Sequence, residues 1–181
     1  MTTNRDFTLG DRYTTYFVTF SVIKWIKIFK FPEPAIIFLE SLRYVQETQK
    51  LLVHAYVIMP SHVHMIVTNK DLDNKQLHKA LTSLRKFTGS RIIRYIERNC
   101  PAFLKVMENH RLGDRKRMFW QEGWHAEAIY SEKFFHQKMD YIHNNPCVAN
   151  LVELPEHYLY SSANSILFNK LGFIKLDDFN F

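Results

Sequence analysis

Two histidines separated by one residue, His62 and His64, are the first feature of this sequence that could support chemistry. They open a segment, His62 to Thr68, whose composition is typical of a β-strand. Because side chains alternate between the two faces of a strand, both imidazoles should point to one face while Val63 points to the other. Such a pair suits a divalent metal ion completed by nearby oxygen ligands. The alternative is two ordinary polar residues at the end of a sheet.

A tyrosine later in the chain could supply a nucleophile. Tyr141 belongs to a segment that begins at Ser131, a good helix N-cap residue, and whose pattern indicates a helix. The apolar stripe expected to pack on a sheet consists of Phe135, Met139 and Ile142. Tyr141 and Asn145 are four residues apart, so they are neighbours on the flank of this stripe and could reach a cleft beside the sheet. Alternatively, Tyr141 is a boundary residue with a solvated hydroxyl.

Basic residues are concentrated in the middle of the chain. The net charge is +6, and 13 Lys and Arg against 5 Asp and Glu lie between Lys70 and Arg117. Such a segment can bind a phosphate backbone, although a solvated helix face would have a similar composition. The candidate backbone contacts are Lys75, Lys79, Lys86, Arg91, Arg94 and Arg98. Trp120 and Trp124 could stack on bases or be buried, and we expect burial.

Length and composition indicate one ordinary domain over residues 1–181, because 181 residues with 46% hydrophobic side chains can bury one core. No apolar run approaches the roughly 20 residues of a membrane span, and no secretory signal is evident. Cys100 and Cys147 stand alone, which argues against a disulfide framework or a zinc ribbon. We therefore expect a cytoplasmic protein without membrane contact.

The chemistry-bearing residues must be positioned by alternating strands and helices. The sequence predicts strands at 16–23, 53–59, 62–68 and about 119–130, with helices at 35–48, 74–98 and from 131 to a stop at 144–146. Residues 60–61 read as the turn of a hairpin. This order predicts an α+β fold, a ferredoxin-like split βαβ arrangement with an antiparallel sheet and an added C-terminal helix that carries Tyr141.

Smaller features define the edges of these elements. Gly89 could interrupt the second helix, and the stretch from Asn99 to Arg117 looks like a loop or insertion. The last helix should end before Pro146, because the residue preceding a proline is pushed away from the α region. The tail from Glu153 to Phe181 shows no regular pattern.

Four motifs occur in one order along the chain: MPSHVHMIV at 59–67, FWQEGWH at 119–125, DYIHNNP at 140–146 and YLYSSA at 158–163. Together they resemble the insertion-sequence-200-like single-tyrosine transposases, particularly their REP-associated relatives, which are members of the HUH (His-hydrophobic-His) superfamily. The resemblance extends over about residues 16–164. The AEAIY stretch around Glu127 departs from the Asp-rich stretch that is more frequent in relatives.

The resemblance implies roles for individual residues. His62 and His64 match the histidine pair that binds a divalent metal, Mg or Mn, and Tyr141 matches the nucleophile. Asn145 matches the third ligand, with Gln137 as the alternative. The implied activity is cleavage and rejoining of single-stranded DNA near hairpins through a 5′-phosphotyrosine. His143 should project to a different helix face and take no part in proton transfer.

Two other functions stay open from the sequence. One is a domesticated protein that binds hairpin DNA and no longer transfers strands. The other is an RNA-binding or protein-binding domain with the same fold, for which the histidine and tyrosine motifs would be coincidental. A homodimer is compatible with either the enzyme or the binding protein.

Overall fold

The computed structural model describes residues 9–10, 12–107, 117–168, 170 and 172–179. Within these residues the chain forms four strands, five α-helices and three short 3-10 turns. The strands are β1 (Thr15–Ser21), β2 (Leu51–Met59), β3 (His62–Asn69) and β4 (His125–Ala128). The helices are α1 (Pro32–Gln49), α2 (Asn74–Asn99), α3 (Ala102–Met107), α4 (Glu132–Val148) and α5 (Ala163–Phe168).

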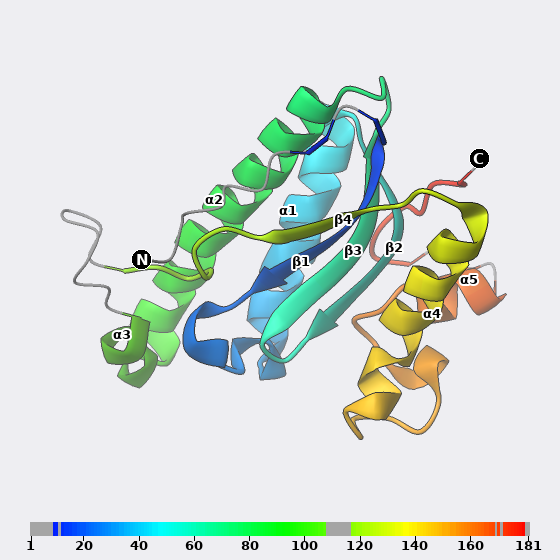
Figure 1. Cartoon of the computed structure of the whole chain (residues 1–181). Helices are drawn as coiled ribbons and strands as arrows, with labels where there is room; N and C mark the ends of the chain where they lie inside the picture. The colour runs from blue at the N-terminus through cyan, green and yellow to red at the C-terminus, as the bar shows by residue number, and fades with distance from the viewer. Residues whose placement is uncertain (1–8, 11, 108–116, 169, 171, 180–181) are drawn as a thin grey trace, which may run out of the picture.

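The strands form one sheet in the order β2-β3-β1-β4, in which all neighbours are antiparallel. The chain forms two strand–helix–strand units, β1-α1-β2 and β3-α2-β4. In the sheet, β3 lies between the two strands of the first unit, and β1 lies between the two strands of the second. The predicted α+β class with an antiparallel sheet is confirmed, and Figure 1 shows the sheet in the middle of the molecule.

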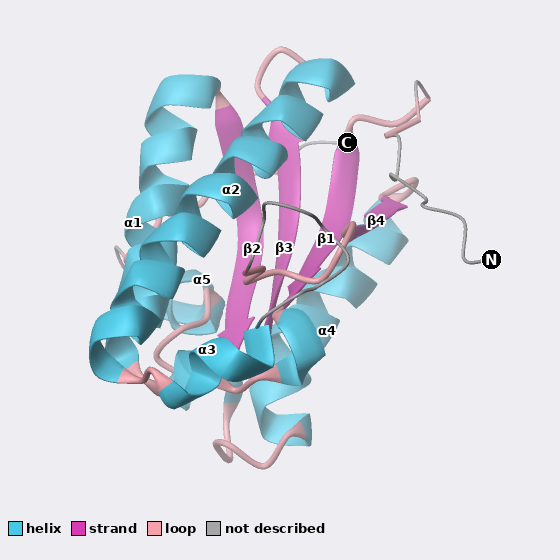
Figure 2. Ribbon diagram, turned by 90° about the vertical axis from the view of Figure 1, so that its left-hand side faces the viewer, coloured by secondary structure: helices cyan, strands magenta, loops and turns pink. Residues whose placement is uncertain are grey.

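Helices cover the two faces of the sheet unequally. Helices α1 and α2 lie side by side on one face, and α4 lies on the other (Figures 1 and 2). The larger core lies between the sheet and helices α1 and α2, and it includes Phe20, Phe38 and Leu81. The smaller core, beneath α4, includes Phe17 and Ile142. Strand β1 therefore has two buried faces, as its aromatic and β-branched composition predicted.

Helix α2 runs without interruption through Gly89, which we expected as a possible break. Gly89 is buried, and a Cβ at this position would lie 3.5 Å from the side chains of Phe119 and Trp120. The absence of a side chain lets the segment before β4 pack closely on α2. Trp120 is buried there and its Nε1 donates to the carbonyl of Arg85 at 3.0 Å. Trp124 is partly buried and packs against the same core, so the expected burial is confirmed for Trp120 and is partial for Trp124.

Strand β4 is shorter than the predicted segment 119–130. Gly123 adopts a positive φ of 69° and bends the chain just before the strand begins. The residues before the bend still contact the end of β1 and the residue that follows it. The N–H of Gln121 donates to the carbonyl of Ser21 at 2.8 Å, and Trp120 forms an isolated bridge with Val22. The expected loop at 99–117 contains helix α3, and residues 108–116 lie outside the described residues.

The prediction that the last helix ends before Pro146 was wrong. Helix α4 continues to Val148, and the N–H of Ala149 still donates to the carbonyl of Asn145 at 3.0 Å. Pro146 is buried together with Ile142, one turn earlier on the same side of the helix. Packing of this side on the sheet outweighs the local preference of a residue that precedes proline. Asn145 consequently stays on the helix.

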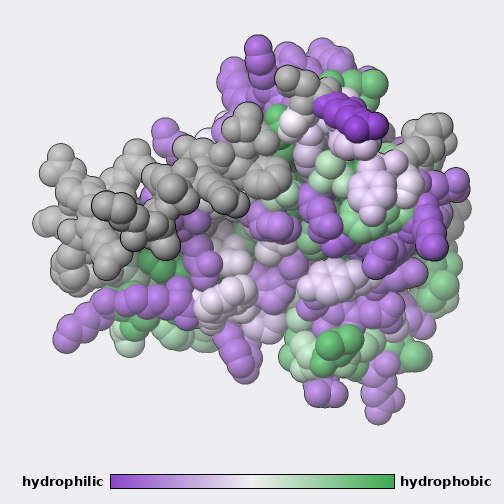
Figure 3. All heavy atoms as spheres, in the orientation of Figure 1, coloured by the Kyte–Doolittle hydropathy of each residue, from purple (hydrophilic) through white to green (hydrophobic). Residues whose placement is uncertain are grey.

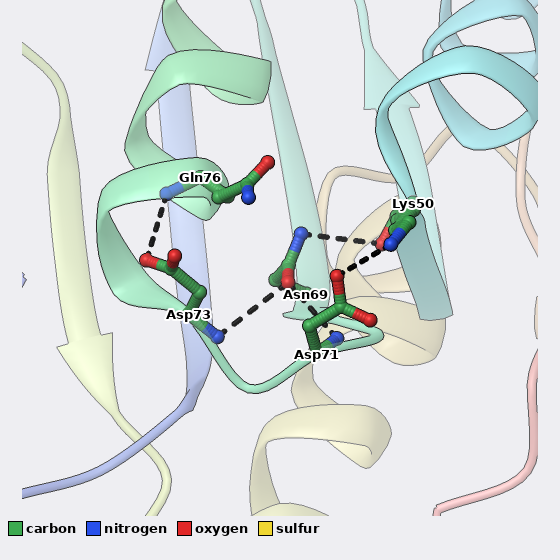
Figure 4. A network of polar contacts seen from close by, with 5 residues as sticks. All are labelled: Lys50, Asn69, Asp71, Asp73 and Gln76. Atoms are coloured by element: carbon green, nitrogen blue, oxygen red, sulfur yellow. Dashed lines mark hydrogen bonds and ion pairs between the residues drawn. The ribbon is translucent and has the colours of Figure 1, made fainter.

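A polar network fixes the connection from β3 to α2 (Figure 4). The Asp73 carboxylate caps α2 by accepting hydrogen bonds from the N–H groups of Lys75 and Gln76. Asn69 Oδ1 accepts from the N–H of Asp71 at 3.0 Å, and Lys50 pairs with the Asp71 carboxylate at 2.7 Å. Lys50, with a φ of 55°, joins α1 to β2 and so ties the ends of both helices to the sheet.

The irregular tail lies along the outer edge of β2. The N–H of Ile58 donates to the carbonyl of Tyr160 at 2.8 Å, and the N–H groups of Ser162 and Asp177 donate to β2 carbonyls at 2.9 Å each. These bonds pair backbone groups that an edge strand would otherwise expose. Figure 3 shows a largely hydrophilic face with hydrophobic residues gathered over the lower end of α4, where Val148 is 81% exposed. Among the described residues, no helix has the length and apolar character that crossing a membrane requires.

Candidate active site

His62 and His64 lie at the start of β3, on the face that α4 covers. Their ring centroids are 4.7 Å apart, so the two imidazoles lie side by side as strand alternation predicted. His64 is opposite Thr19 of β1, and His62 is opposite Ser21 at the end of that strand. The pair therefore lies at the end of the sheet where the central strand β3 begins, next to α4, and we call this end the corner of the site.

The contacts of His64 leave one of its ring nitrogens available. Its Nδ1 forms a hydrogen bond with the Thr19 hydroxyl at 2.8 Å, and its ring stacks on Phe17 with centroids 5.2 Å apart. Its Nε2 is buried and has no hydrogen-bond partner among the described residues. A buried polar atom without a partner is costly, and a metal ion bound at Nε2 would satisfy it. With a metal ion at Nε2, the Nδ1–H group would donate this hydrogen bond and the Thr19 hydroxyl oxygen would accept it.

The environment keeps this histidine neutral. Burial is the main reason why the pKa of His64 is lowered to about 3, and the nearby His62 and Lys138 lower this pKa further. Burial also lowers the pKa of His62. A neutral imidazole has the free lone pair that metal ligation requires. The donor set thus fits a divalent ion, and the two histidines are the residues that would hold it.

Tyr141 of α4 lies directly beside this pair. Its ring contacts His64 edge-on, with centroids 5.3 Å apart, and contacts Phe17 at 5.8 Å. The side chain is 50% exposed, so it borders the smaller core without being enclosed by it. Burial of Phe134 and Ile142 fixes the rotation of α4 and thereby turns Tyr141 toward the histidines. Residues from two distant motifs are brought together at this corner.

The two candidate third ligands differ in their surroundings. At about 100° of rotation per residue, Asn145 is turned roughly 40° from Tyr141 toward the buried Ile142, and Gln137 by a similar angle away from it. Asn145 is accordingly half-buried and Gln137 exposed. The Asn145 side chain forms no hydrogen bond within the described part of the chain. No group of three or more His, Cys, Asp and Glu that could hold a metal occurs among the described residues, so a third protein ligand would have to be of another type, such as an amide.

Three further residues at this corner, Lys138, Glu127 and Thr19, were given no role by the sequence interpretation. Lys138 Nζ lies 2.5 Å from Glu127 Oε2 of β4 and 4.7 Å from the centroid of the Phe17 ring. It places a cation beside His64, where an anionic substrate group would be attracted. Thr19 orients His64 and had no signal in the sequence, because strand register decides which residue faces it. Lys138 had a signal, since it lies three residues before Tyr141.

His143 lies on a different side of α4, as expected. Its Nε2 forms a hydrogen bond with the Ser162 hydroxyl at 2.9 Å, and Ser162 also bonds to Tyr56 of β2. Burial lowers the pKa of His143 to about 4. This histidine joins α4 to the YLYSSA segment and does not face the histidine pair.

One solved structure resembles the chain over its whole length. It is a REP-associated tyrosine transposase bound to a REP hairpin, with 17% identity and a TM-score of 0.61, covering 100% of this chain and 95% of that chain. This chain has the fold of a REP-associated tyrosine transposase. A transposase candidate from Deinococcus radiodurans R1 has 18% identity and a TM-score of 0.47, covering 80% of this chain and 97% of that chain. No protein-family model and no curated protein matches the sequence.

In this transposase fold, the six predicted DNA contacts lie away from the histidine and tyrosine corner. They belong to α2, which packs on the opposite face of the sheet from α4 (Figure 2). Five of the six are exposed, and Arg91 is half-buried and pairs with Glu40 of α1 at 3.0 Å. The lysines Lys75, Lys79 and Lys86 follow one side of α2, and Arg91, Arg94 and Arg98 follow another, nearer α1.

Proposed function

We propose that this chain is a transposase that cleaves and rejoins single-stranded DNA near hairpins, with Tyr141 as the nucleophile. The observation that carries the proposal is the contact between Tyr141 and His64, whose buried Nε2 is unpartnered among the described residues. A half-exposed phenol beside two neutral imidazoles is suited to attack on a phosphate held at the same corner. The fold shared with a tyrosine transposase supports this use of the site.

The reaction is a transesterification that conserves the number of phosphoester bonds. The Tyr141 oxygen bonds to phosphorus while the bond to the 3′-oxygen breaks, which leaves a 5′-phosphotyrosine and a free 3′-OH. The phenolic proton is lost, and the departing 3′-oxygen gains one. A 3′-OH from another strand can reverse the step without ATP. When bound, Mg or Mn would polarise the scissile phosphate and offset the charge that develops on it.

The residues around Tyr141 have separable tasks in this proposal. His62, His64 and Asn145 would hold the metal ion, with Thr19 fixing the orientation of the His64 ring. Lys138, held by Glu127, presents a positive charge where the phosphate must enter. Asn145 is preferred over Gln137 because it is half-buried on the side of Tyr141 that faces the sheet.

The proposed substrate is a single strand that carries a hairpin. Attack in line with the leaving oxygen favours a flexible strand over a duplex. The structurally similar transposase is bound to a REP hairpin, and the exposed basic residues of α2 offer this chain a second contact surface for phosphates. Because α2 and α4 cover opposite faces of the sheet, a DNA that touches both must pass around an edge of the sheet.

The decisive experiment is adduct formation with single-stranded hairpin DNA taken from the sequence that flanks the gene. With Mg or Mn, the wild-type chain should yield a covalent protein–DNA band on a denaturing gel, and EDTA should prevent it. Tyr141→Phe should give none, whereas Tyr130→Phe, a matched control with 57% exposure next to α4, should behave like wild type. Hairpin binding without an adduct from the wild type would favour the domesticated binding protein instead.

The third ligand can be tested without measuring catalysis. Asn145→Ala should weaken binding of Mn, followed by calorimetry, by about 10- to 100-fold, and Gln137→Ala should leave it unchanged. The opposite result would assign the ligand to Gln137 and remove Asn145 from the proposal. His64→Ala should abolish Mn binding in the same measurement.

A further inference from the structure

The loop between β1 and α1, residues 22–31, presents an exposed tryptophan beside the histidine pair. Trp25 is 54% exposed, and its ring contacts His62 edge-on with centroids 5.8 Å apart. Large aromatic side chains usually become buried, as Trp120 is in this chain. Neither the metal site nor the nucleophile needs an indole at this position, so the exposed ring calls for a separate explanation.

The loop is held rigidly against the turn that leads into His62. The N–H of Val22 donates to the carbonyl of Ser61 at 2.9 Å, and the N–H of Phe29 donates to the carbonyl of Pro60 at 3.0 Å. The side chains of Ile28 and Phe29 are buried in the larger core. Both ends of the loop are therefore fixed to the β2–β3 turn, and the loop, blue in Figure 1, follows the end of β1.

The backbone at the tip of the loop is in a conformation that side chains disfavour. Lys24 and Trp25 have φ values of 51° and 56°, in the left-handed region that costs a residue other than glycine about 1 kcal/mol or more. Such strain persists where the surrounding structure enforces it, and here the two anchors do so. The result is an indole that stands out of the loop next to His62.

The same loop is basic. Lys24, Lys27 and Lys30 are all exposed, and none forms an ion pair within the residues that the structure describes. An exposed aromatic ring among unpaired lysines is the composition by which proteins hold single-stranded nucleic acid, with bases on the ring and phosphates on the cations. A protein partner bound to this ring is less consistent with the proposed function, because it would cover the histidine pair, which the DNA must reach.

We infer that Trp25 is a stacking platform for a base of the single strand next to the scissile phosphate, and that Lys24 and Lys27 contact the flanking phosphates. This inference rests on the proposed function and adds a positioning residue to it. Stacking on the indole fixes the strand at His62, so the phosphate that follows is presented to Tyr141. Every base has a π face, so the platform is tolerant of sequence.

Binding can be separated from cleavage by working with Tyr141→Phe throughout. Affinities are measured for oligo-dT and for an abasic strand of the same length, which keeps the phosphates and lacks the bases. Trp25→Ala should weaken oligo-dT binding by roughly 10-fold and leave abasic binding unchanged, while Trp25→Phe should restore most of the loss. Lys27→Ala should weaken both strands equally and reduce the dependence on salt.

Two controls make the outcome unambiguous. Tyr44→Ala, which removes a 57% exposed ring from α1 in the opposite layer, should change neither affinity. Oligo-dT should quench tryptophan emission in the chain that retains Trp25 and not in Trp25→Phe, although Trp120 and Trp124 remain in both. The stacking role is refuted if Trp25→Ala lowers the affinity for oligo-dT and for the abasic strand equally, or if oligo-dT quenches no Trp25 emission. An adduct from the chain with Tyr141 intact would then still uphold the proposed function.

Discussion

The two faces of the sheet are built for different purposes. Among the described residues, 30 buried hydrophobic residues form the larger core under α1 and α2, against 9 in the smaller core under α4. On the first side, the buried Ser41 hydroxyl donates to the carbonyl of Ile37 within its own helix. On the α4 side, the half-buried Thr19 hydroxyl of β1 bonds to His64 of β3. The first face contributes most of the buried apolar surface, and the second holds polar groups at fixed positions, where the proposed site lies.

The difference also explains why the active-site candidates lie at a corner. The smaller core does not cover the end of the sheet where His62 lies half-buried and Tyr141 half-exposed. A fully apolar second face would be more stable and would exclude a phosphate. This difference between the faces can be tested by substitutions on one face that change stability, metal affinity or adduct formation, compared with substitutions on the other.

The largest expected effect is on stability. Leu81→Ala removes a side chain with 0% exposure from the larger core and should lower the free energy of unfolding by about 2–5 kcal/mol. Chemical denaturation measures this loss, and the chain that remains folded should form the DNA adduct at its normal rate. Ile142→Ala, its counterpart on the α4 face, should reduce both stability and adduct formation. Equal losses of adduct formation from both variants would contradict the division between the faces.

A smaller effect should fall on the site alone. Thr19→Val keeps the shape of the side chain and removes the hydroxyl that bonds to His64 Nδ1. Loss of such an orienting partner should weaken Mn affinity by about 10- to 100-fold, measured by calorimetry. The thermal midpoint should change little, because valine has nearly the size and shape of threonine and position 19 is only half-buried. Thr14→Val, in the loop before β1, provides a substitution of the same type away from His64. Unchanged Mn affinity in Thr19→Val would mean that the hydroxyl does not orient the ligand.

The smallest effect concerns pH. His54 of β2 is buried, with Nδ1 donating to the Asp177 carbonyl at 2.8 Å and Nε2 accepting from the Thr68 hydroxyl at 2.9 Å. Burial lowers its pKa, although Asp177 and Asp178 act in the opposite direction. The unfolded chain therefore binds a proton at a higher pH than the folded chain, and stability is lost as the pH falls below about 6.5.

Replacing this histidine should reduce that pH dependence. His54→Gln should narrow the difference in thermal midpoint between pH 7.5 and pH 5.5 by roughly 2–4 °C, measured by circular dichroism. Other histidines with lowered pKa, such as His143, remain in both chains and account for the residual dependence. An identical pH profile for the variant would show that His54 does not titrate in this range. The test concerns the α4 face alone, because among the described residues no histidine is buried on the face that α1 and α2 cover.

Much of the fold could be predicted because its signals are local. Alternation and helical periodicity placed the four strands and the long helices, and their order predicted the antiparallel sheet. The end of α4 and the short β4 were not predicted correctly, since packing of Pro146 and the bend at Gly123 depend on distant contacts. The placement of His62 and His64 followed from strand alternation. The Thr19 contact did not, because register between strands is set by the whole sheet.

The tail along β2 has a consequence for self-association. Backbone groups of Tyr56 and Ile58 that could pair with a second copy are already occupied by the chain's own residues 160–162. Among the described strands, β4 is then the remaining sheet edge, and it is only four residues long. Two copies that joined by extending the sheet would have to do so through β4, whose Glu127 already pairs with Lys138 beside the site. A dimer of that kind would place two copies of the proposed site on one continuous sheet.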